Sequence, residues 1–195
     1  PEQRLLSART SLPPALHLAR VPAKDEIGER IWLRAEGRCE VSYEAQVQVE
    51  RLLPDIAGLA ALEPHALPGP VVEYLLESRY CPSGQFGEFV GGEFAGLAGG
   101  ALVLAMRDWI STQVEYRPGV SDSTTGAFDT FTARAGICRD FAHVMVAMAR
   151  AAAIPARYVS CFAPGVKPQD FHAVAEVFLA DPMVPGGGAW HIVDA

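Results

Sequence analysis

The sequence lacks the features of several common functional classes. Lysine occurs only at Lys24 and Lys167, no run of basic residues is present, and 16 basic residues stand against 23 acidic ones. The resulting net charge of −7 argues against a broad binding surface for nucleic acid or for an anionic membrane. No apolar stretch is long enough to cross a bilayer, so no transmembrane helix is expected.

Signatures of cofactors and metals are also missing. No glycine-rich segment lies between a strand and a helix, which is the setting that a phosphate-binding loop requires. The cysteines form no C-x-x-C pair, which disfavours structural zinc, and their wide spacing in an acidic chain favours free thiols. These cysteines are Cys39, Cys81, Cys138 and Cys161. We therefore expect no cofactor and no metal.

The N-terminal residues 1–9 show no charged segment followed by an apolar core, so no signal peptide is visible. On this ground a cytoplasmic location is expected. The chain starts at Pro1 rather than at Met, so the expectation applies to the sequence as given.

The 195 residues present are half hydrophobic, which is ordinary for a globular chain with a sizeable core. Residues 1–22 are poorly patterned, and Pro13 and Pro14 are expected to break any regular element there. Residues 31–36 and 40–50 alternate between apolar and polar, which predicts half-buried antiparallel strands with a hairpin turn at Gly37. Residues 1–53 are therefore assigned to part of a β-rich N-terminal domain.

Residues 54–195 have a different pattern and are assigned to a second domain. A short helix is predicted over 71–80 and a longer one over 101–114. A buried helix is predicted over 141–153, because residues 141–153 are apolar nearly all round. Three strands are predicted to follow, separated by loops rich in proline and glycine. They cover 156–162, 171–179 and 190–194. A buried helix followed by antiparallel strands indicates an α+β fold.

Cys138 lies at the predicted start of the buried helix. The unpaired N–H groups and the dipole at a helix N-terminus favour the thiolate, and they can also stabilise an oxyanion formed at a carbonyl. Such a nucleophile needs a histidine as base and a third group to orient it. His172 begins the second predicted strand and Asp194 ends the third, so adjacent strands would bring them together. Taken singly, each of the three has a plain structural explanation; their joint order is what favours catalysis.

Several segments resemble motifs of the bacterial transglutaminase-like superfamily, and they occur in the same order. The nucleophile motif is matched by GICRDFAH at 136–143, the following strand by AIPARYVS at 153–160, the histidine motif by DFHA at 170–173 and the aspartate motif by WHIVDA at 190–195. SRYC at 78–81 and YRPG at 116–119 are similar to upstream segments of the same branch. Members of this branch are described as putative cysteine proteases.

The resemblance implies a papain-like fold with Cys138 as nucleophile, His172 as base and Asp194 as the residue that orients the base. It implies acyl transfer from a peptide or protein amide through a thioester, to water in a protease or to an amine in a transglutaminase. A non-catalytic interaction module that keeps the fold is the alternative, and a domain of an amide-forming system is a third reading. Tyr116 is a weaker candidate for an oxyanion donor, and His143 is expected to be buried with a hydrogen-bond partner.

Overall fold

The structure of this chain is a computed structural model that describes residues 3–22, 30–49, 55–163, 165–167, 169–184 and 187–195. The chain divides into two units, residues 1–54 and 55–195, each of which is described by itself. No helix in the described ranges has both the length and the apolar character needed to cross a membrane.

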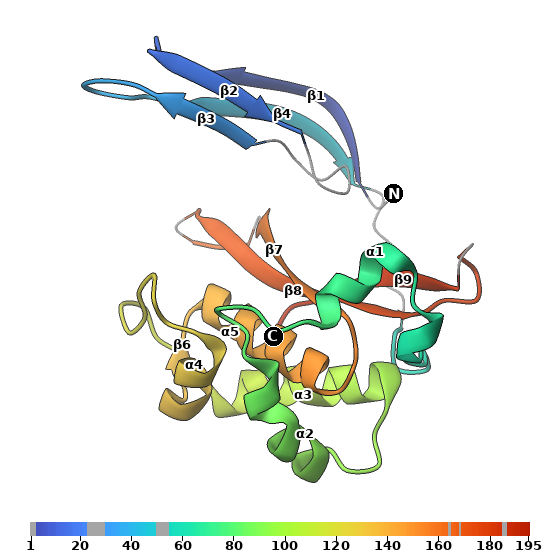
Figure 1. The fold of residues 1–195 in the computed structure, drawn as a ribbon. Helices are drawn as coiled ribbons and strands as arrows, with labels where there is room; N and C mark the ends of the chain where they lie inside the picture. The colour runs from blue at the N-terminus through green and yellow to red at the C-terminus, as the bar shows by residue number, and fades with distance from the viewer. Residues whose placement is uncertain (1–2, 23–29, 50–54, 164, 168, 185–186) are drawn as a thin grey trace. The chain divides into compact units, whose positions relative to one another are not determined.

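The first unit consists of four strands arranged as two nested antiparallel pairs. The strands are β1 (Gln3–Ser11), β2 (His17–Val21), β3 (Arg30–Arg34) and β4 (Ser42–Val49). The outer pair is β1 with β4 and the inner pair is β2 with β3, as the blue and cyan ribbons of Figure 1 show. Each pair is a two-stranded sheet of its own.

This arrangement corrects three expectations for the N-terminal region. Regular strands occupy residues 3–11 and 17–21, because Pro13 and Pro14 lie between the two strands rather than inside them. The predicted hairpin is wrong, since β3 and β4 pair with β2 and β1 instead of with each other. Half-burial is also wrong for β4, where every residue is exposed, because a two-stranded sheet has no second layer of its own to cover a face.

The second unit contains a three-stranded antiparallel sheet in the order β7-β8-β9. The strands are β7 (Ala156–Phe162), β8 (Phe171–Ala180) and β9 (Gly188–Val193). Their positions confirm the three strands predicted between loops rich in proline and glycine. In this register Cys161 lies opposite His172, and Ala175 lies opposite Val193.

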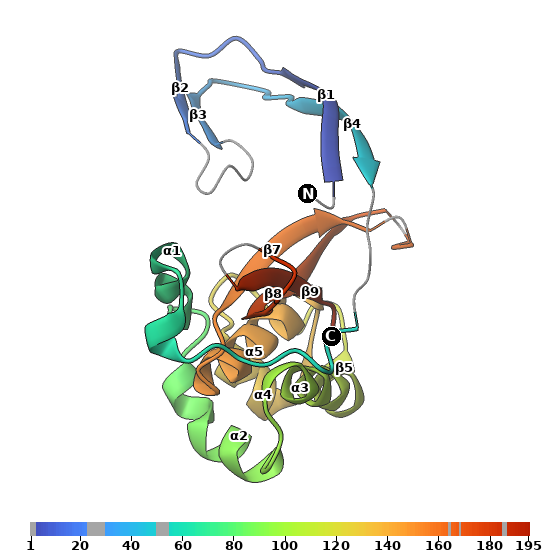
Figure 2. The same cartoon turned by 90° about the vertical axis from the view of Figure 1, so that its right-hand side faces the viewer.

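The helix α5 (Cys138–Ala151) lies at the centre of the second unit, between the sheet and the other helices (Figures 1 and 2). All residues from 140 to 149 are buried, which confirms the prediction of a central helix. The surrounding helices are α2 (Gly87–Glu93), α3 (Gly99–Gln113) and α4 (Ala127–Ala133). The helix predicted over 101–114 is confirmed as well. It is α3, which begins two residues earlier than predicted and ends at residue 113.

The opposite face of the sheet is covered by the segment that enters the second unit. Leu67 and Val71 form a small buried cluster with Phe178 of β8, and Trp190 of β9 packs against it. The helix predicted over 71–80 is shorter than expected. It consists of α1 (Gly69–Val72) and a 3₁₀ turn, η2 (Glu73–Leu75), after which Leu76 is extended with φ −77° and ψ 149°. The mixed layers confirm the α+β class.

Candidate active site

Cys138 is the first residue of α5, and the chain enters the helix through a short parallel bridge. The bridge joins β5 (Glu115–Tyr116) to β6 (Ala135–Gly136), directly before Ile137 and Cys138. A Cβ on Gly136 would lie 2.8 Å from the Cβ of Asp140, so this close approach requires glycine. The side chain of Cys138 is half-buried. The positive end of the helix dipole therefore lies beside this thiol.

Asp140 holds the first turn of α5 in place. Its Oδ2 accepts a hydrogen bond of 2.9 Å from the backbone N–H of Ile137. Its Oδ1 accepts two further bonds, of 3.0 and 2.8 Å, from Nε and Nη2 of Arg139. The Asp140 side chain is fully buried, and the Arg139 side chain is 30% exposed. The carboxylate is thus neutralised by Arg139 and acts as a helix cap, as the sequence predicts for an acidic residue in this turn.

His172 and Asp194 are brought together by adjacent strands. The Nε2 atom of His172 lies 2.9 Å from Oδ1 and 3.0 Å from Oδ2 of Asp194. An ionised carboxylate only accepts hydrogen bonds, so Nε2 is the donor in this contact, in which Nδ1 takes no part. The His172 side chain is 18% exposed and that of Asp194 is 60% exposed.

Cys138 and His172 are not joined by a hydrogen bond within the part of the chain that the structure describes. Their elements are packed together, since α5 lies against β8. Tyr158 of β7 lies within electrostatic reach of the thiol: burial raises the pKa of Tyr158, and the charge of Cys138 raises it further. The predicted pair of base and orienting group is therefore in contact, whereas the nucleophile makes no direct bond to it.

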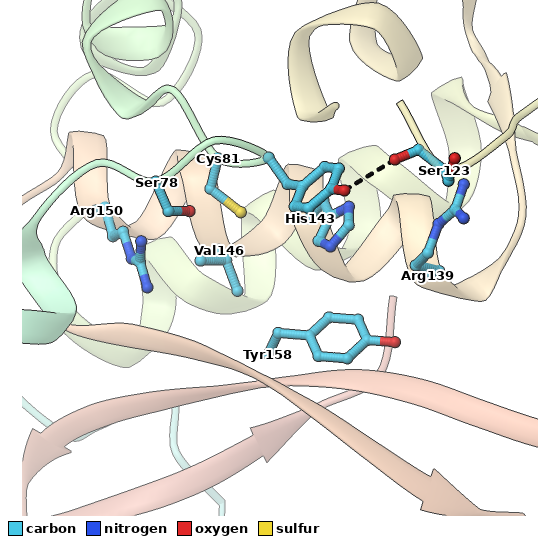
Figure 3. A pocket seen from close by; sticks show the side chains of 9 residues that line it. Ser78, Cys81, Ser123, Arg139, His143, Val146, Arg150 and Tyr158 are labelled. Carbon is cyan, nitrogen blue, oxygen red and sulfur yellow. Dashed lines mark hydrogen bonds between the residues drawn. The ribbon is translucent and has the colours of Figure 1, made fainter. Parts of the chain in front are cut away.

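A cavity of about 470 Å³ extends along α5, and Arg139, the residue after Cys138, is among the residues that line it (Figure 3). It is called the α5 pocket below. One helical face supplies four of its lining residues, Arg139, His143, Val146 and Arg150. The remaining lining residues are Ser78, Tyr80, Cys81, Ser123 and Tyr158. Its volume is in the range typical of ligand sites.

His143 lies in the middle of the α5 pocket between two tyrosine rings. Its ring is stacked on Tyr80, with centroids 5.2 Å apart and an interplanar angle of 9°, and it also contacts Tyr158 at 5.2 Å. Burial lowers the pKa of His143 to about 4, although the charge of Asp140 acts in the opposite direction. The imidazole is therefore neutral near pH 7. The expectation of a fully satisfied buried histidine is wrong, because Nδ1 is buried and has no hydrogen-bond partner.

Other residues of the site differ from the expectations or were missed. Tyr116 is 60% exposed and its ring lies 6.1 Å from that of Phe141, so it is not a core tyrosine. Sequence reasoning did not identify Tyr80, Tyr158 or Arg150 as members of a pocket. One signal was available: His143 and Arg150 interrupt an otherwise apolar helix, and together with Arg139 they lie at helical spacing on one face.

Comparisons with known proteins agree with this architecture. Residues 95–195 match the family model described as the transglutaminase-like superfamily. A solved structure, a putative cysteine protease from Cytophaga hutchinsonii, is 33% identical with a TM-score of 0.84 over 99% of this chain and 66% of that one. The periplasmic domain of TgpA from Pseudomonas aeruginosa is 22% identical with a TM-score of 0.45, covering 80% of this chain and 54% of that one.

A curated relative, an uncharacterized protein from Mycobacterium leprae, is 37% identical over 60 residues, which are 31% of this chain and 21% of the relative. The chain thus spans about a fifth of this relative's length and 66% of the Cytophaga protein. The family model covers more than half of the chain, and the matched residues include α5 and the sheet described above. The chain therefore belongs to the transglutaminase-like superfamily.

Proposed function

We propose that this protein is a cysteine-dependent amide hydrolase or acyl transferase, with Cys138 as nucleophile, His172 as base and Asp194 as the residue that orients His172. The observation that carries the proposal is the contact of His172 Nε2 with the Asp194 carboxylate at 2.9 Å. This contact leaves Nδ1 of His172 as the proton acceptor. The position of Cys138 at the N-terminus of α5 supports the proposal, because that position favours a thiolate.

The reaction would proceed in two steps. In the first, Nδ1 of His172 takes the thiol proton, and the sulfur of Cys138 attacks the amide carbonyl to form a tetrahedral oxyanion. When that species collapses, the C–N bond breaks, the imidazolium returns its proton to the leaving amine, and a thioester remains on Cys138. In the second, water or an amine attacks the thioester while His172 accepts its proton. Collapse then releases the acid or a new amide and returns the proton to the thiolate. Asp194 stabilises the imidazolium formed in each step.

The proposed substrate is a peptide or protein amide. The backbone N–H groups of Cys138 and Arg139 are suited to stabilise the oxyanion, because the first residues of a helix have no acceptor within it. The N–H of Asp140 already donates to the carbonyl of Ile137 at 2.9 Å. Asp140 does not weaken this positive end, since its charge is balanced by Arg139. Water as acceptor makes the protein a protease or amidase, and an amine makes it a transamidase.

Selective alkylation of Cys138 tests the proposal directly. The native 195-residue chain is treated with limiting iodoacetamide across a pH series, and the label is located by peptide mass spectrometry. Labelling of Cys138 should exceed that of the exposed Cys39 and should persist below the ordinary thiol range of pKa values. Burial raises the pKa of Cys81, so this thiol is the slow internal reference. Equal labelling of Cys138 and Cys39 would reject an activated nucleophile and favour the interaction module.

Two variants complete the test. His172→Ala should remove the selective labelling, while His17→Ala, which changes an exposed histidine of β2, should not. Asp194→Ala should lower amide turnover by about 10²- to 10⁴-fold with the fold retained, because its side chain is largely exposed. Global unfolding of Asp194→Ala would instead make this residue structural. Turnover is measured on peptide amides with and without added primary amines, which separates hydrolysis from transamidation.

A further inference from the structure

The α5 pocket has a chemical character that the rest of the chain does not share. The whole chain carries a net charge of −7, yet two of the side chains lining this cavity are arginines. Among the described residues that line it, none is aspartate or glutamate. Figure 3 shows Arg139 at one end of the cavity, Arg150 at the other, and His143 between them.

The two arginines differ in their partners. Arg139 is paired with the buried carboxylate of Asp140, so its charge is already balanced. Arg150 donates from Nε and Nη2 to the carbonyl of Ala156, at 3.0 and 2.7 Å, and from Nη1 to the carbonyl of Leu76 at 2.7 Å. These partners are neutral. Because a guanidinium has five N–H donors, the three bonds hold Arg150 in place and leave two N–H groups and the whole charge for a further partner.

The electrostatic surroundings of Arg150 agree with this description. Burial lowers the pKa of Arg150, and the groups that act against burial are the thiol of Cys81 and the phenol of Tyr74, not a carboxylate. A partly buried cation stabilised only by carbonyl dipoles and weak acids is a favourable place for an anionic ligand group.

His143 is another unusual group of this cavity. It is only 8% exposed, its side chain lines the cavity, and its buried Nδ1 makes no hydrogen bond with any of the described residues. A polar atom that is buried without a partner is normally satisfied by water or by a ligand. The flat rings of Tyr80 and Tyr158 enclose this imidazole, and the Tyr80 hydroxyl is tied to the backbone oxygen of Ser123 at 2.8 Å. The middle of the cavity is therefore a slot in which His143 is held between two aromatic rings.

We propose that the α5 pocket recognises an acidic residue of the substrate peptide, whose carboxylate pairs with Arg150 and whose chain passes His143. This inference names the substrate class of the active site and rests on the proposed function for its connection with Cys138. Tyr80 and Tyr158 form the walls of the site, and the ring of His143 is packed between them. Arg150 is the specificity-determining residue.

The length of the cavity sets where the acidic residue stands. Arg139 and Arg150 are separated by eleven helical positions, which corresponds to about 16 Å along the axis. Side chains on a helix lean toward its N-terminus, so the guanidinium of Arg150 lies nearer to Cys138 than its Cα does. An extended peptide advances roughly 3.3 Å per residue, which places the carboxylate about three or four residues from the amide that is cleaved.

Binding to a variant that cannot react tests the proposal independently of catalysis. The 195-residue chain with Cys138→Ala is titrated calorimetrically with acetylated, amidated alanine-based hexapeptides in which a single glutamate is moved along the sequence. Each peptide has a twin with glutamine at the same position. We expect one position at which the glutamate peptide binds at least tenfold more tightly than its glutamine twin. Equal affinity of the twins at every position would overturn the proposal.

Variants then assign the preference to the cavity. Arg150→Gln should abolish the difference between the twins, whereas Arg107→Gln, which changes an arginine of α3 paired with Asp108, should leave it unchanged. Arg150→Met removes the charge but keeps an unbranched side chain, and it serves as the second variant if Arg150→Gln does not fold. A preference that persists in every folded variant at position 150 would overturn the assignment.

A spectroscopic measurement locates the bound peptide without any change to the cavity. The ring resonances of His143 should shift on addition of the glutamate peptide, while those of the exposed His17 should not. Tight binding with no shift at His143 would place the peptide elsewhere and reject the proposal.

The proposed function and this inference can fail separately. Selective labelling of Cys138 together with equal affinity of the peptide twins would leave the enzyme and reject the acidic substrate. A clear glutamate preference together with unselective labelling would support the pocket and reject the catalytic thiol.

Discussion

The two units of the chain use their apolar residues in opposite ways. In residues 55–195 the apolar side chains of α3, α5 and the sheet form a continuous core in which Val144, Met145 and Leu179 are completely buried. In residues 1–54 the large apolar side chains of the described strands lie in contact with solvent. Leu16 is 66% exposed and Trp32 is 68% exposed. Apolar side chains thus form a core in one unit and lie on an open surface in the other.

The difference teaches that alternation along a strand does not by itself bury a face. A strand needs a second layer, and β8 has one on each side, with α5 on one face and the cluster around Phe178 on the other. The pairs β1–β4 and β2–β3 are two-stranded, and such sheets are marginally stable by themselves. The candidate active-site residues all come from the unit with the packed core, where neighbouring layers can hold side chains in place.

Expressing the two units as separate chains should give the largest difference in stability. A chain of residues 55–195 should unfold in one cooperative transition, because every member of the two buried clusters lies at Ile56 or later. A chain of residues 1–54 should show no cooperative transition by itself. Circular dichroism during heating measures both. Loss of the transition in residues 55–195 would show that this unit depends on the first one.

Matched truncations of leucine sharpen the comparison within the intact chain. Leu179→Ala in β8 removes a side chain with no exposed surface and should lower the free energy of unfolding by about 3 kcal/mol. Leu18→Ala in β2, where the leucine is 43% exposed, should change it by less than about 0.5 kcal/mol. Urea unfolding gives both values. Equal losses of the free energy of unfolding would mean that β2 is packed under a second layer, as β8 is.

The pH dependence of stability separates a buried histidine from an exposed one. Since the pKa of His143 is lowered from 6.5 to about 4 in the folded chain, the unfolded chain takes up a proton between these values that the folded chain does not. The contribution of the neutral His143 to the free energy of unfolding is fully present above pH 6.5 and is lost as the pH falls toward 4. His143→Gln should therefore reduce the loss of stability between pH 7 and pH 5 by on the order of 1 kcal/mol.

The control for this measurement is His17→Gln in the first unit, which should leave the pH profile as it is in the unchanged chain. Urea unfolding at a series of pH values provides the comparison. An unchanged profile in His143→Gln would mean that the imidazole is not held neutral in the folded state.

The smallest effect is expected for the exposed tryptophan of β3. Trp32→Gln should change the free energy of unfolding by less than about 0.5 kcal/mol, because 68% of this residue is already in contact with solvent. Its fluorescence should also be quenched readily by iodide, unlike that of the half-buried Trp109 in α3. Strong protection of Trp32 would reveal a covering layer over the first unit and would remove the contrast between the units.

Much of the second unit was predictable from the sequence. The apolar stretch after Cys138 has no polar face, so it indicates a central helix, and α5 occupies that place. Short segments between loops rich in proline and glycine predicted β7, β8 and β9, and the order of Cys138, His172 and Asp194 predicted the candidate triad. His172 contacts Asp194 because β8 and β9 are neighbours in the sheet. The positions of the two residues at the ends of adjacent predicted strands therefore indicated this contact.

The pairing of the N-terminal strands was not predictable in the same way. Alternation at 31–36 and 40–50 indicates strands but does not name their partners, and a short connection near Gly37 favours a hairpin by default. The actual partners, β2 and β1, lie farther away in the sequence. Local patterning carries no information on such distant pairing.

The sequence by itself determined the elements of the second unit and the chemistry available at the start of α5, because helical and strand periodicity and residue type are local properties. Only the tertiary structure decided the composition of the α5 pocket. Tyr80, His143 and Tyr158 come from three separate segments and meet only when the loop, the helix and the sheet are packed. Packing also decided that Nδ1 of His143 has no partner, since hydrogen bonding in a core depends on which neighbours enclose an atom.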